Sequence, residues 1–128
     1  MNVEDFNFIV EGELKRCQTT LVSKAAEYAT EDRLHNFKVA ATLAGCTPAQ
    51  ALGGMMIKHT VSIYDMIQED GIIEHPMSVW TEKITDHLNY LLLLSAILHE
   101  EEMLKDDRVF EGQDPIPTPE PEGQNTNA

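Results

Sequence analysis

The feature that most constrains the fold of this chain is an apolar segment, residues 80–98, which carries acidic side chains near its start. Ile84, Leu88 and Leu91 recur at the spacing of one helix face, and the leucines at 91–94 leave no polar side there. A helix that is apolar all round belongs in a core, so we predict that this one is buried on every side.

The rest of the chain predicts an all-α fold. Leu, Ala and Ile are the commonest apolar residues, aromatic residues make up 6% of the chain, and we find no alternating strand pattern of useful length. The clearest helix start is Thr47, because Pro48 and Gln50 follow it as in a capping box with proline at the first position. We expect a compact bundle of four main helices, over about 3–29, 30–44, 48–70 and 76–105.

Periodic apolar positions on these helices predict the core. We expect it to join the residues Leu21, Phe37, Met56, Ile63, Leu88, Leu91 and Leu98.

We predict one helical domain, residues 1–110, followed by a tail. Residues 111–128 are Pro-rich, acidic and polar, so we expect them to be disordered. Cys17 and Cys46 lack the spacing of a metal site and indicate reduced thiols in a cytoplasmic protein. The acidic N-terminus does not resemble a secretory signal, and no apolar run is long enough to span a bilayer.

The net charge of −13 restricts the partners of the chain. It argues against binding to a nucleic-acid backbone, and we expect neither nucleic acid nor membrane as a partner. It does not argue against a small phosphate ligand that is held through a metal ion.

Glu82 and Asp86 lie four residues apart and therefore share a helix face, which Asn89 continues with Tyr90 beside it. They could be solvated acids that favour the positive end of the helix dipole. They could equally form a hard-cation site, because paired carboxylates supply the oxygen ligands that Mg²⁺ prefers.

A second set of oxygen-bearing side chains lies on the second predicted helix, where Asp32 and Asn36 are four apart. Asp32 could be an ordinary residue of a helix start, or it could face Glu82 and Asp86 across the bundle. On the third predicted helix, Lys58 could pair with Asp65 or meet phosphate. The neighbouring His59 is more typical of a core residue than of a ligand.

Three short motifs in about residues 27–98 resemble the MazG-like proteins of the all-α NTP pyrophosphatase superfamily, in a small bacteriophage-type branch. They are Tyr28-Ala-Thr-Glu-Asp-Arg-Leu-His-Asn-Phe37, Met55-Met-Ile-Lys58 and Glu82-x-x-x-Asp86-x-x-x-Tyr90. The chain departs from the wider pattern at Lys83, which replaces an acid, and at Lys58 and His59, where an acidic pair is usual.

The resemblance implies a Mg²⁺-dependent enzyme that cleaves a nucleoside triphosphate to the monophosphate and pyrophosphate, in a homo-oligomer. It implies metal ligands at Glu82 and Asp86, with Asp32 as the third. It also implies substrate contacts from Lys58, Asn36, Asn89 and Tyr90. The alternative is a non-catalytic acidic helical protein that binds a host protein, as a phage-encoded protein would.

Overall fold

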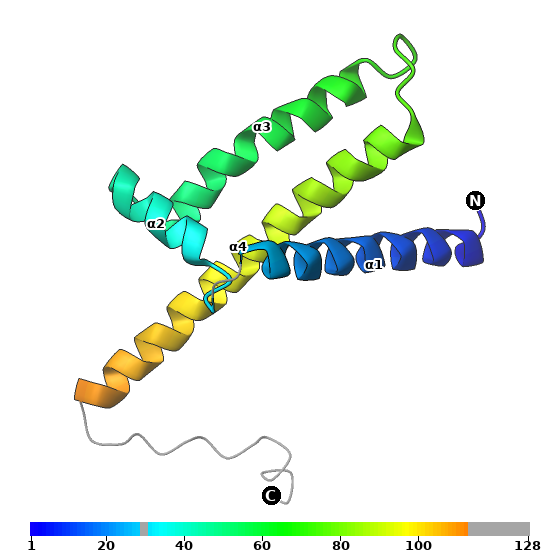
Figure 1. Ribbon diagram of the computed structural model, residues 1–128. Coiled ribbons are helices and arrows are strands. Elements are labelled where there is room, and N and C mark those ends of the chain that lie inside the picture. Colours follow the sequence, from blue (N-terminus) through cyan, green and yellow to red (C-terminus); the bar gives the residue numbers. More distant parts are fainter. Residues whose placement is uncertain (29–30, 113–128) are drawn as a thin grey trace, which may run out of the picture. The chain divides into compact units, whose positions relative to one another are not determined.

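The structure, a computed structural model, describes residues 1–28 and 31–112, with the side chains of residues 1–24 and 31–107. The described residues form four helices and no strand, which confirms the all-α class (Figure 1). The helices are α1 (Val3–Tyr28), α2 (His35–Ala44), α3 (Pro48–Gln68) and α4 (Met77–Gly112). No helix within these residues combines the length and the apolar character that crossing a membrane requires.

The chain divides into two units, Met1–Leu98 and His99–Ala128. The first contains α1, α2, α3 and most of the apolar part of α4. In the second, the described residues continue α4 to Gly112, two residues into the predicted tail. Residues 113–128, on which the prediction of disorder falls, lie outside the described part of the chain.

The turn between α2 and α3 follows the sequence signals closely. Gly45 ends α2 in the left-handed conformation, at φ 68°, which glycine adopts without the strain that a Cβ would bring. At the start of α3, the Thr47 hydroxyl accepts a hydrogen bond from the backbone N–H of Gln50 (3.1 Å). The Gln50 side chain in turn accepts from the backbone N–H of Thr47 (3.0 Å), so the predicted capping box is confirmed.

The predicted start of the second helix, near residue 30, is wrong. Helix α2 begins at His35, and Asp32 lies before it instead of in its first turn. The Asp32 carboxylate accepts hydrogen bonds from the backbone N–H of Leu34 (2.9 Å) and from the Lys38 ammonium (2.6 Å). These contacts hold the chain in a turn ahead of the helix, an arrangement that the acidic residues alone do not predict.

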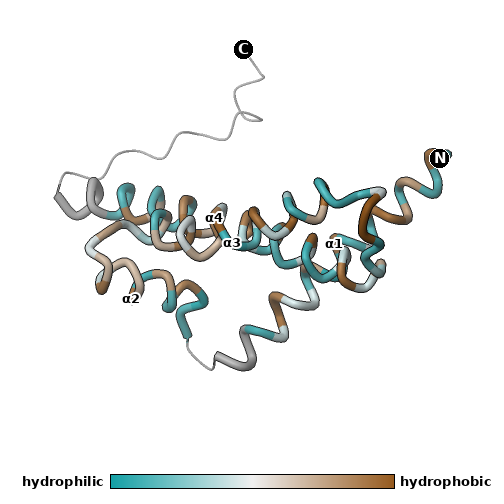
Figure 2. Tube along the Cα trace, turned by 90° about the horizontal axis from the view of Figure 1, so that it is seen from above, coloured by the Kyte–Doolittle hydropathy of each residue, from teal (hydrophilic) through white to brown (hydrophobic). Residues whose placement is uncertain are grey.

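The core of the first unit joins α2, α3 and α4. Its buried members are Leu34, Phe37, Leu52 and Ile97, with Tyr90 and partly buried apolar residues packed against them. Hydrophobic positions nevertheless occur along each of the four helices, as Figure 2 shows. The core is therefore smaller than the apolar content of the chain suggests.

The prediction that α4 is buried all round is wrong. Leu91 is 45% exposed and Leu98 is 47% exposed, whereas the buried residues of this helix are Thr85, Asn89 and Ile97. The four-residue steps from Thr85 to Ile97 define the side of α4 that packs within the unit. Thr85 is buried despite its polarity because its hydroxyl donates a hydrogen bond to Glu13 of α1 (2.8 Å).

Candidate functional site

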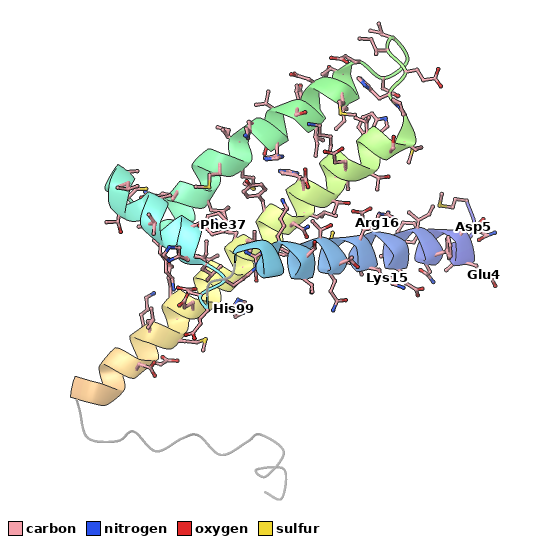
Figure 3. All side chains as sticks on the ribbon, in the orientation of Figure 1. Glu4, Asp5, Lys15, Arg16, Phe37 and His99 are labelled. Carbon is pink, nitrogen blue, oxygen red and sulfur yellow. The ribbon has the colours of Figure 1, made fainter. Side chains whose placement is uncertain are left out.

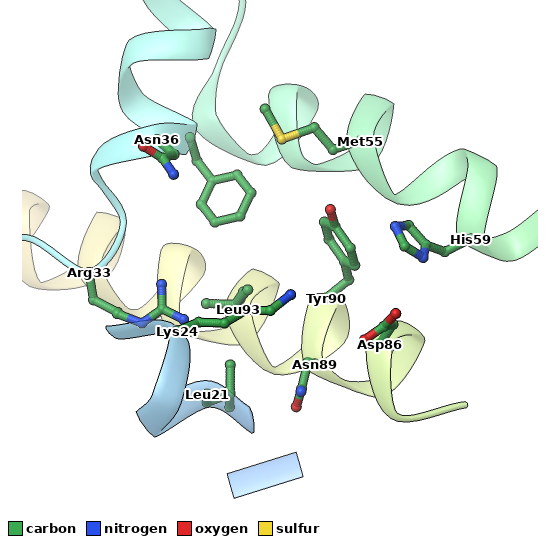
Figure 4. Close-up of a pocket in the computed structure, with 11 residues that line it drawn as sticks. Leu21, Lys24, Arg33, Asn36, Met55, His59, Asp86, Asn89, Tyr90 and Leu93 are labelled. Atoms are coloured by element: carbon green, nitrogen blue, oxygen red, sulfur yellow. The ribbon is translucent and has the colours of Figure 1, made fainter. Parts of the chain in front are cut away.

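A pocket of about 170 Å³ lies where the helices of the first unit approach one another (Figure 4). One end of its wall comes from α1 and from Arg33, which precedes α2, and the rest comes from α2, α3 and α4. Its lining residues are Leu21, Lys24, Arg33, Asn36, Phe37, Met55, His59, Asp86, Asn89, Tyr90 and Leu93.

Helix α4 supplies four of these residues: Asn89 and Tyr90 are adjacent, and Asp86 and Leu93 lie about one turn before and one turn after them. Tyr90 rises from α4 toward α3, where Met55 and His59 lie (Figure 4). Helix α4 therefore contributes a carboxylate, an amide, a phenol and an apolar side chain to the pocket wall.

The ring of His59 packs against the ring of Tyr90, with 4.9 Å between the centroids. Burial lowers the pKa of His59, and the negative charge of Asp86 acts in the opposite direction but does not overcome it. His59 therefore favours the neutral form, in which one ring nitrogen donates and the other accepts.

Asn89 is the most unusual polar group of the pocket. It is only 6% exposed, and its Oδ1 atom has no hydrogen-bond partner in the described part of the chain. Its amide points toward the α1 side of the pocket, where Leu21 lies (Figure 4). A buried acceptor without a partner destabilises a fold by about 1–3 kcal/mol.

Two cations, Lys24 and Arg33, border the pocket, and sequence reasoning missed both. Lys24 is on α1 and Arg33 is in the segment before α2, so no shared spacing in the sequence links them to Asp86 or Asn89. The pocket thus combines basic groups from α1 and from the segment before α2 with oxygen-bearing groups from α4.

A second hollow, an open groove of about 860 Å³, runs between α1 and the first turns of α4. Its α1 wall carries the basic residues Lys15 and Arg16, which Figure 3 labels on that helix. Its α4 wall carries Glu82 and Asp86, and both helices also contribute hydroxyl side chains to the lining. Asp86 therefore borders both the pocket and the groove.

Glu13 connects the two helices at this groove. Its Oε1 atom accepts hydrogen bonds from Thr85 of α4 and, more weakly, from Cys17, while Oε2 accepts from the guanidinium of Arg16. Burial by itself raises the pKa of Glu13, but the hydrogen bonds from Arg16 and Thr85 outweigh it, so the pKa lies below its ordinary value. Burial, followed by the charge of Glu13, raises the pKa of Cys17 and keeps it a thiol.

The structure brings most of the predicted site residues together. Asn36, Asn89 and Tyr90 line the pocket with Asp86, and Glu82 lies with Asp86 in the groove. These positions were found from helical spacing and from the resemblance.

The other two predicted site residues lie elsewhere. Lys58 is exposed. Asp32 binds Lys38 and the backbone ahead of α2, and the hydrogen bond from Lys38 lowers its pKa. Neither residue is among those that line the pocket or the groove.

Within the described residues, no three His, Cys, Asp or Glu side chains converge as the ligands of a metal ion. Glu82 and Asp86 would therefore act as a pair of ligands for a metal ion. Comparisons with protein-family models, with characterised proteins and with solved structures find no match to this chain. The chemistry of the pocket and the groove is therefore the basis on which a function can be assigned.

Proposed function

We propose that the chain binds a nucleoside triphosphate with Mg²⁺ and hydrolyses it to the monophosphate and pyrophosphate. The observation that carries the proposal is the position of Asp86, which borders a partly apolar pocket on one side and a groove with a second carboxylate on the other. A nucleotide has the same two parts, a flat ring and a charged phosphate chain.

The sizes of the two hollows suit these parts. Pockets that hold a whole drug-sized ligand measure about 300–1,000 Å³. The pocket, at about 170 Å³, is smaller and suits a base, which Phe37, Tyr90 and Leu93 can contact through apolar surface. The sugar and phosphates would then extend past Asp86 into the groove, where Lys15 and Arg16 offer positive charge.

The pair Glu82 and Asp86 fits a metal ion that arrives with the nucleotide. Mg²⁺ in such sites is commonly held by one or two carboxylates together with phosphate oxygens, so a third protein ligand is not required. The bound ion would neutralise phosphate charge and help to activate water. The role of Asp32 as a third ligand and that of Lys58 at the phosphates remain predictions.

The proposed reaction is a substitution at the α-phosphorus. A water oxygen forms the new bond to phosphorus, the bond from phosphorus to the oxygen bridging toward the β-phosphate breaks, and pyrophosphate leaves with that oxygen. The water proton passes to solvent. Lys15 and Arg16 would stabilise the charge on the departing group, which is the main contribution that a protein makes to phosphoryl transfer.

Asp86→Asn tests the proposal, with Asp65→Asn, at an exposed position of α3, as the matched control. Asn cannot bind a hard cation as a carboxylate does, so we expect Asp86→Asn to abolish Mg²⁺-dependent nucleotide binding. The metal-free variant should be as stable as the parent or slightly more so, because one of two neighbouring negative charges is removed.

Binding is measured by titration calorimetry with Mg²⁺ and each deoxynucleoside triphosphate, and hydrolysis by release of pyrophosphate. The Asp65→Asn control should retain both. Failure of the parent chain to bind any nucleotide, or equal binding by Asp86→Asn, would overturn the proposal.

The alternative function, a non-catalytic helical protein that binds a macromolecule, is favoured by one observation. The first half of α1 exposes large apolar side chains, including Phe6, Phe8 and Leu14, which are between half and four-fifths exposed. Such groups on a helix surface are typical of contacts with another chain. This function predicts that removing these side chains abolishes partner capture and leaves nucleotide binding absent throughout.

A further inference from the structure

We propose that the loop between α3 and α4 is a docking site for a basic amphipathic segment of another protein. The loop spans residues 69–76 and lies at the opposite end of the α3–α4 hairpin from α2 (Figure 1). A hollow of about 290 Å³ is formed by this loop and the start of α4. None of its lining residues also lines the pocket or the groove, so the inference is separate from the proposed nucleotide function.

The loop is held in shape by contacts within the hairpin. The backbone N–H groups of Ile72 and Ile73 both donate hydrogen bonds to the carbonyl oxygen of Glu69, each at 2.9 Å. The carboxylate of Glu69 is also hydrogen-bonded to Nε2 of His75 (2.9 Å), which joins the start of the loop to its end. The ring of His75 packs edge-on against the ring of Trp80 on α4, with 6.1 Å between the centroids. These contacts give the loop its shape before any partner binds.

This ordered loop nevertheless presents large apolar side chains to solvent. Ile72 is 82% exposed, Ile73 is 51% exposed, and Met77 at the start of α4 is 73% exposed. The wall of the hollow includes both isoleucines and the half-buried side chain of Trp80. Clustered apolar groups on a surface are typical of contact sites, and a preformed loop loses little further conformational freedom when a partner covers it.

The charges around the hollow define the chemistry of the partner. The described residues that line it include Asp70 and Glu74 but neither lysine nor arginine. The sequence also has no lysine or arginine between Lys58 and Lys83. An acidic partner would therefore bring like charges together, whereas a basic partner would complement them. A helix with one apolar face and lysine or arginine beside it would complement both the isoleucines and the acids.

The same charges argue against a lipid surface as the partner. Amphipathic segments that lie in a membrane interface carry lysine and arginine beside their apolar residues, and anionic headgroups attract these cations. Asp70 and Glu74 would instead be repelled by such headgroups. The apolar loop with its acidic border therefore fits a basic protein segment better than it fits a membrane.

Trp80 can report occupation of the hollow, because it is the only tryptophan of the chain and lies in the wall. The test ligand is a synthetic helical peptide without tryptophan that carries leucine on one face and lysine on the other. Titration of the full chain with this peptide should change the fluorescence of Trp80 in a saturable way. Two control peptides, with glutamate for each lysine or with serine for each leucine, should bind at least about tenfold more weakly.

Substitution of the two exposed isoleucines tests the apolar part of the site. Ile72→Ser combined with Ile73→Ser should weaken binding of the leucine–lysine peptide by about tenfold or more. Leu43→Ser, at a position of α2 that is 83% exposed, is the matched control and should leave the affinity unchanged. Thermal unfolding checks that each variant is folded. If the isoleucine variant does not fold, the charge variant described next decides the question on its own.

Neutralisation of the acids tests the charged part. Asp70→Asn combined with Glu74→Gln should weaken peptide binding by about three- to tenfold at low salt, and the difference should shrink as salt is added. Glu11→Gln combined with Glu31→Gln removes the same charge from exposed positions away from the loop and should change the affinity by less than about twofold.

Three results would overturn the inference. The first is equal binding of the three peptides, or no fluorescence change with any of them. The second is an equal loss of affinity in the loop variants and in their matched controls. The third is binding of the chain to phosphatidylcholine vesicles while the leucine–lysine peptide leaves the fluorescence of Trp80 unchanged, which would assign the loop to a lipid surface.

Discussion

At the scale of single residues, buried polar groups of α4 mark where the helix meets the rest of the first unit. Thr85 and Asn89 occupy positions that a pattern based on hydrophobicity assigns to the surface. Thr85 is stabilised there by Glu13, which is 72 residues away in the chain. A pairing over that distance leaves no trace in local spacing, so the sequence did not predict which side of α4 is buried.

The ionised carboxylate of Glu13 should make stability depend on pH. The folded pKa of Glu13 lies below the ordinary value of 4.5, so its contribution is complete above that pH and is lost as the pH falls through the folded pKa. We expect Glu13→Gln to lower the free energy of unfolding by about 1–3 kcal/mol near neutral pH, with a smaller difference from the parent in acid.

Urea unfolding at a series of pH values from about 3 to 7 measures this effect. Glu11→Gln, at an exposed position of α1, is the control and should change stability by less than about 0.5 kcal/mol. A difference for Glu13→Gln that grows as the pH falls would contradict the assigned hydrogen bonds.

At the scale of helices, signals carried by a few adjacent residues were read correctly. The capping box of Thr47 and Gln50 is present as predicted, because a cap depends on neighbours in the chain. The buried face of α4 was missed because the leucines at 91–94 are apolar in every direction and favour no side. The start of α2 was missed because Asp32 can serve a turn as readily as a helix start.

The candidate site likewise has residues that local spacing predicts and residues that only the packing of separate helices brings in. Asp86, Asn89 and Tyr90 were found because one helix carries them at helical spacing. Lys24 and Arg33 come from separate elements, and only the packing of the helices brings them to the pocket. His59 was interpreted as a core histidine, and its burial and ring contact agree with that while placing it in the pocket wall.

The buried position of Leu52 on α3 predicts how much this helix contributes to the stability of the fold. Leu52 is fully buried among Leu34, Phe37 and Ile97, so Leu52→Ala should lower the free energy of unfolding by about 2–5 kcal/mol. Leu43→Ala, on the exposed side of α2, removes the same atoms from solvent-facing positions and should change it by less than about 0.5 kcal/mol. Chemical denaturation measures both, and equal losses would contradict the observed core.

At the scale of the whole molecule, the exposed apolar face of α4 predicts self-association. Ile84, Leu91 and Leu98 are seven residues apart, and each is between 38% and 47% exposed. A seven-residue repeat of apolar side chains is the pattern of helices that pair lengthwise. We therefore expect a homo-oligomer in which this face meets a second copy of the chain.

Sedimentation at micromolar concentration should show a species larger than the monomer. Leu91→Glu should dissociate it, because a charge on the paired face would lose its water. Val61→Glu, at a similarly exposed apolar position of α3, should leave the assembly intact. A monomeric parent chain, or equal effects of the two substitutions on the assembly, would contradict this prediction.

The turn between α2 and α3 has a consequence for how the chain reaches its fold. Residues 45–47 alone separate the two helices, and their contact needs only a very short loop to close. The hydrogen bond between Glu13 and Thr85 instead joins residues that are 72 positions apart, so a long loop must close before it can form. Contacts between neighbours in sequence form fastest, so the α2–α3 hairpin is the natural nucleus, and the docking of α1 on α4 belongs to the late, slow part of folding.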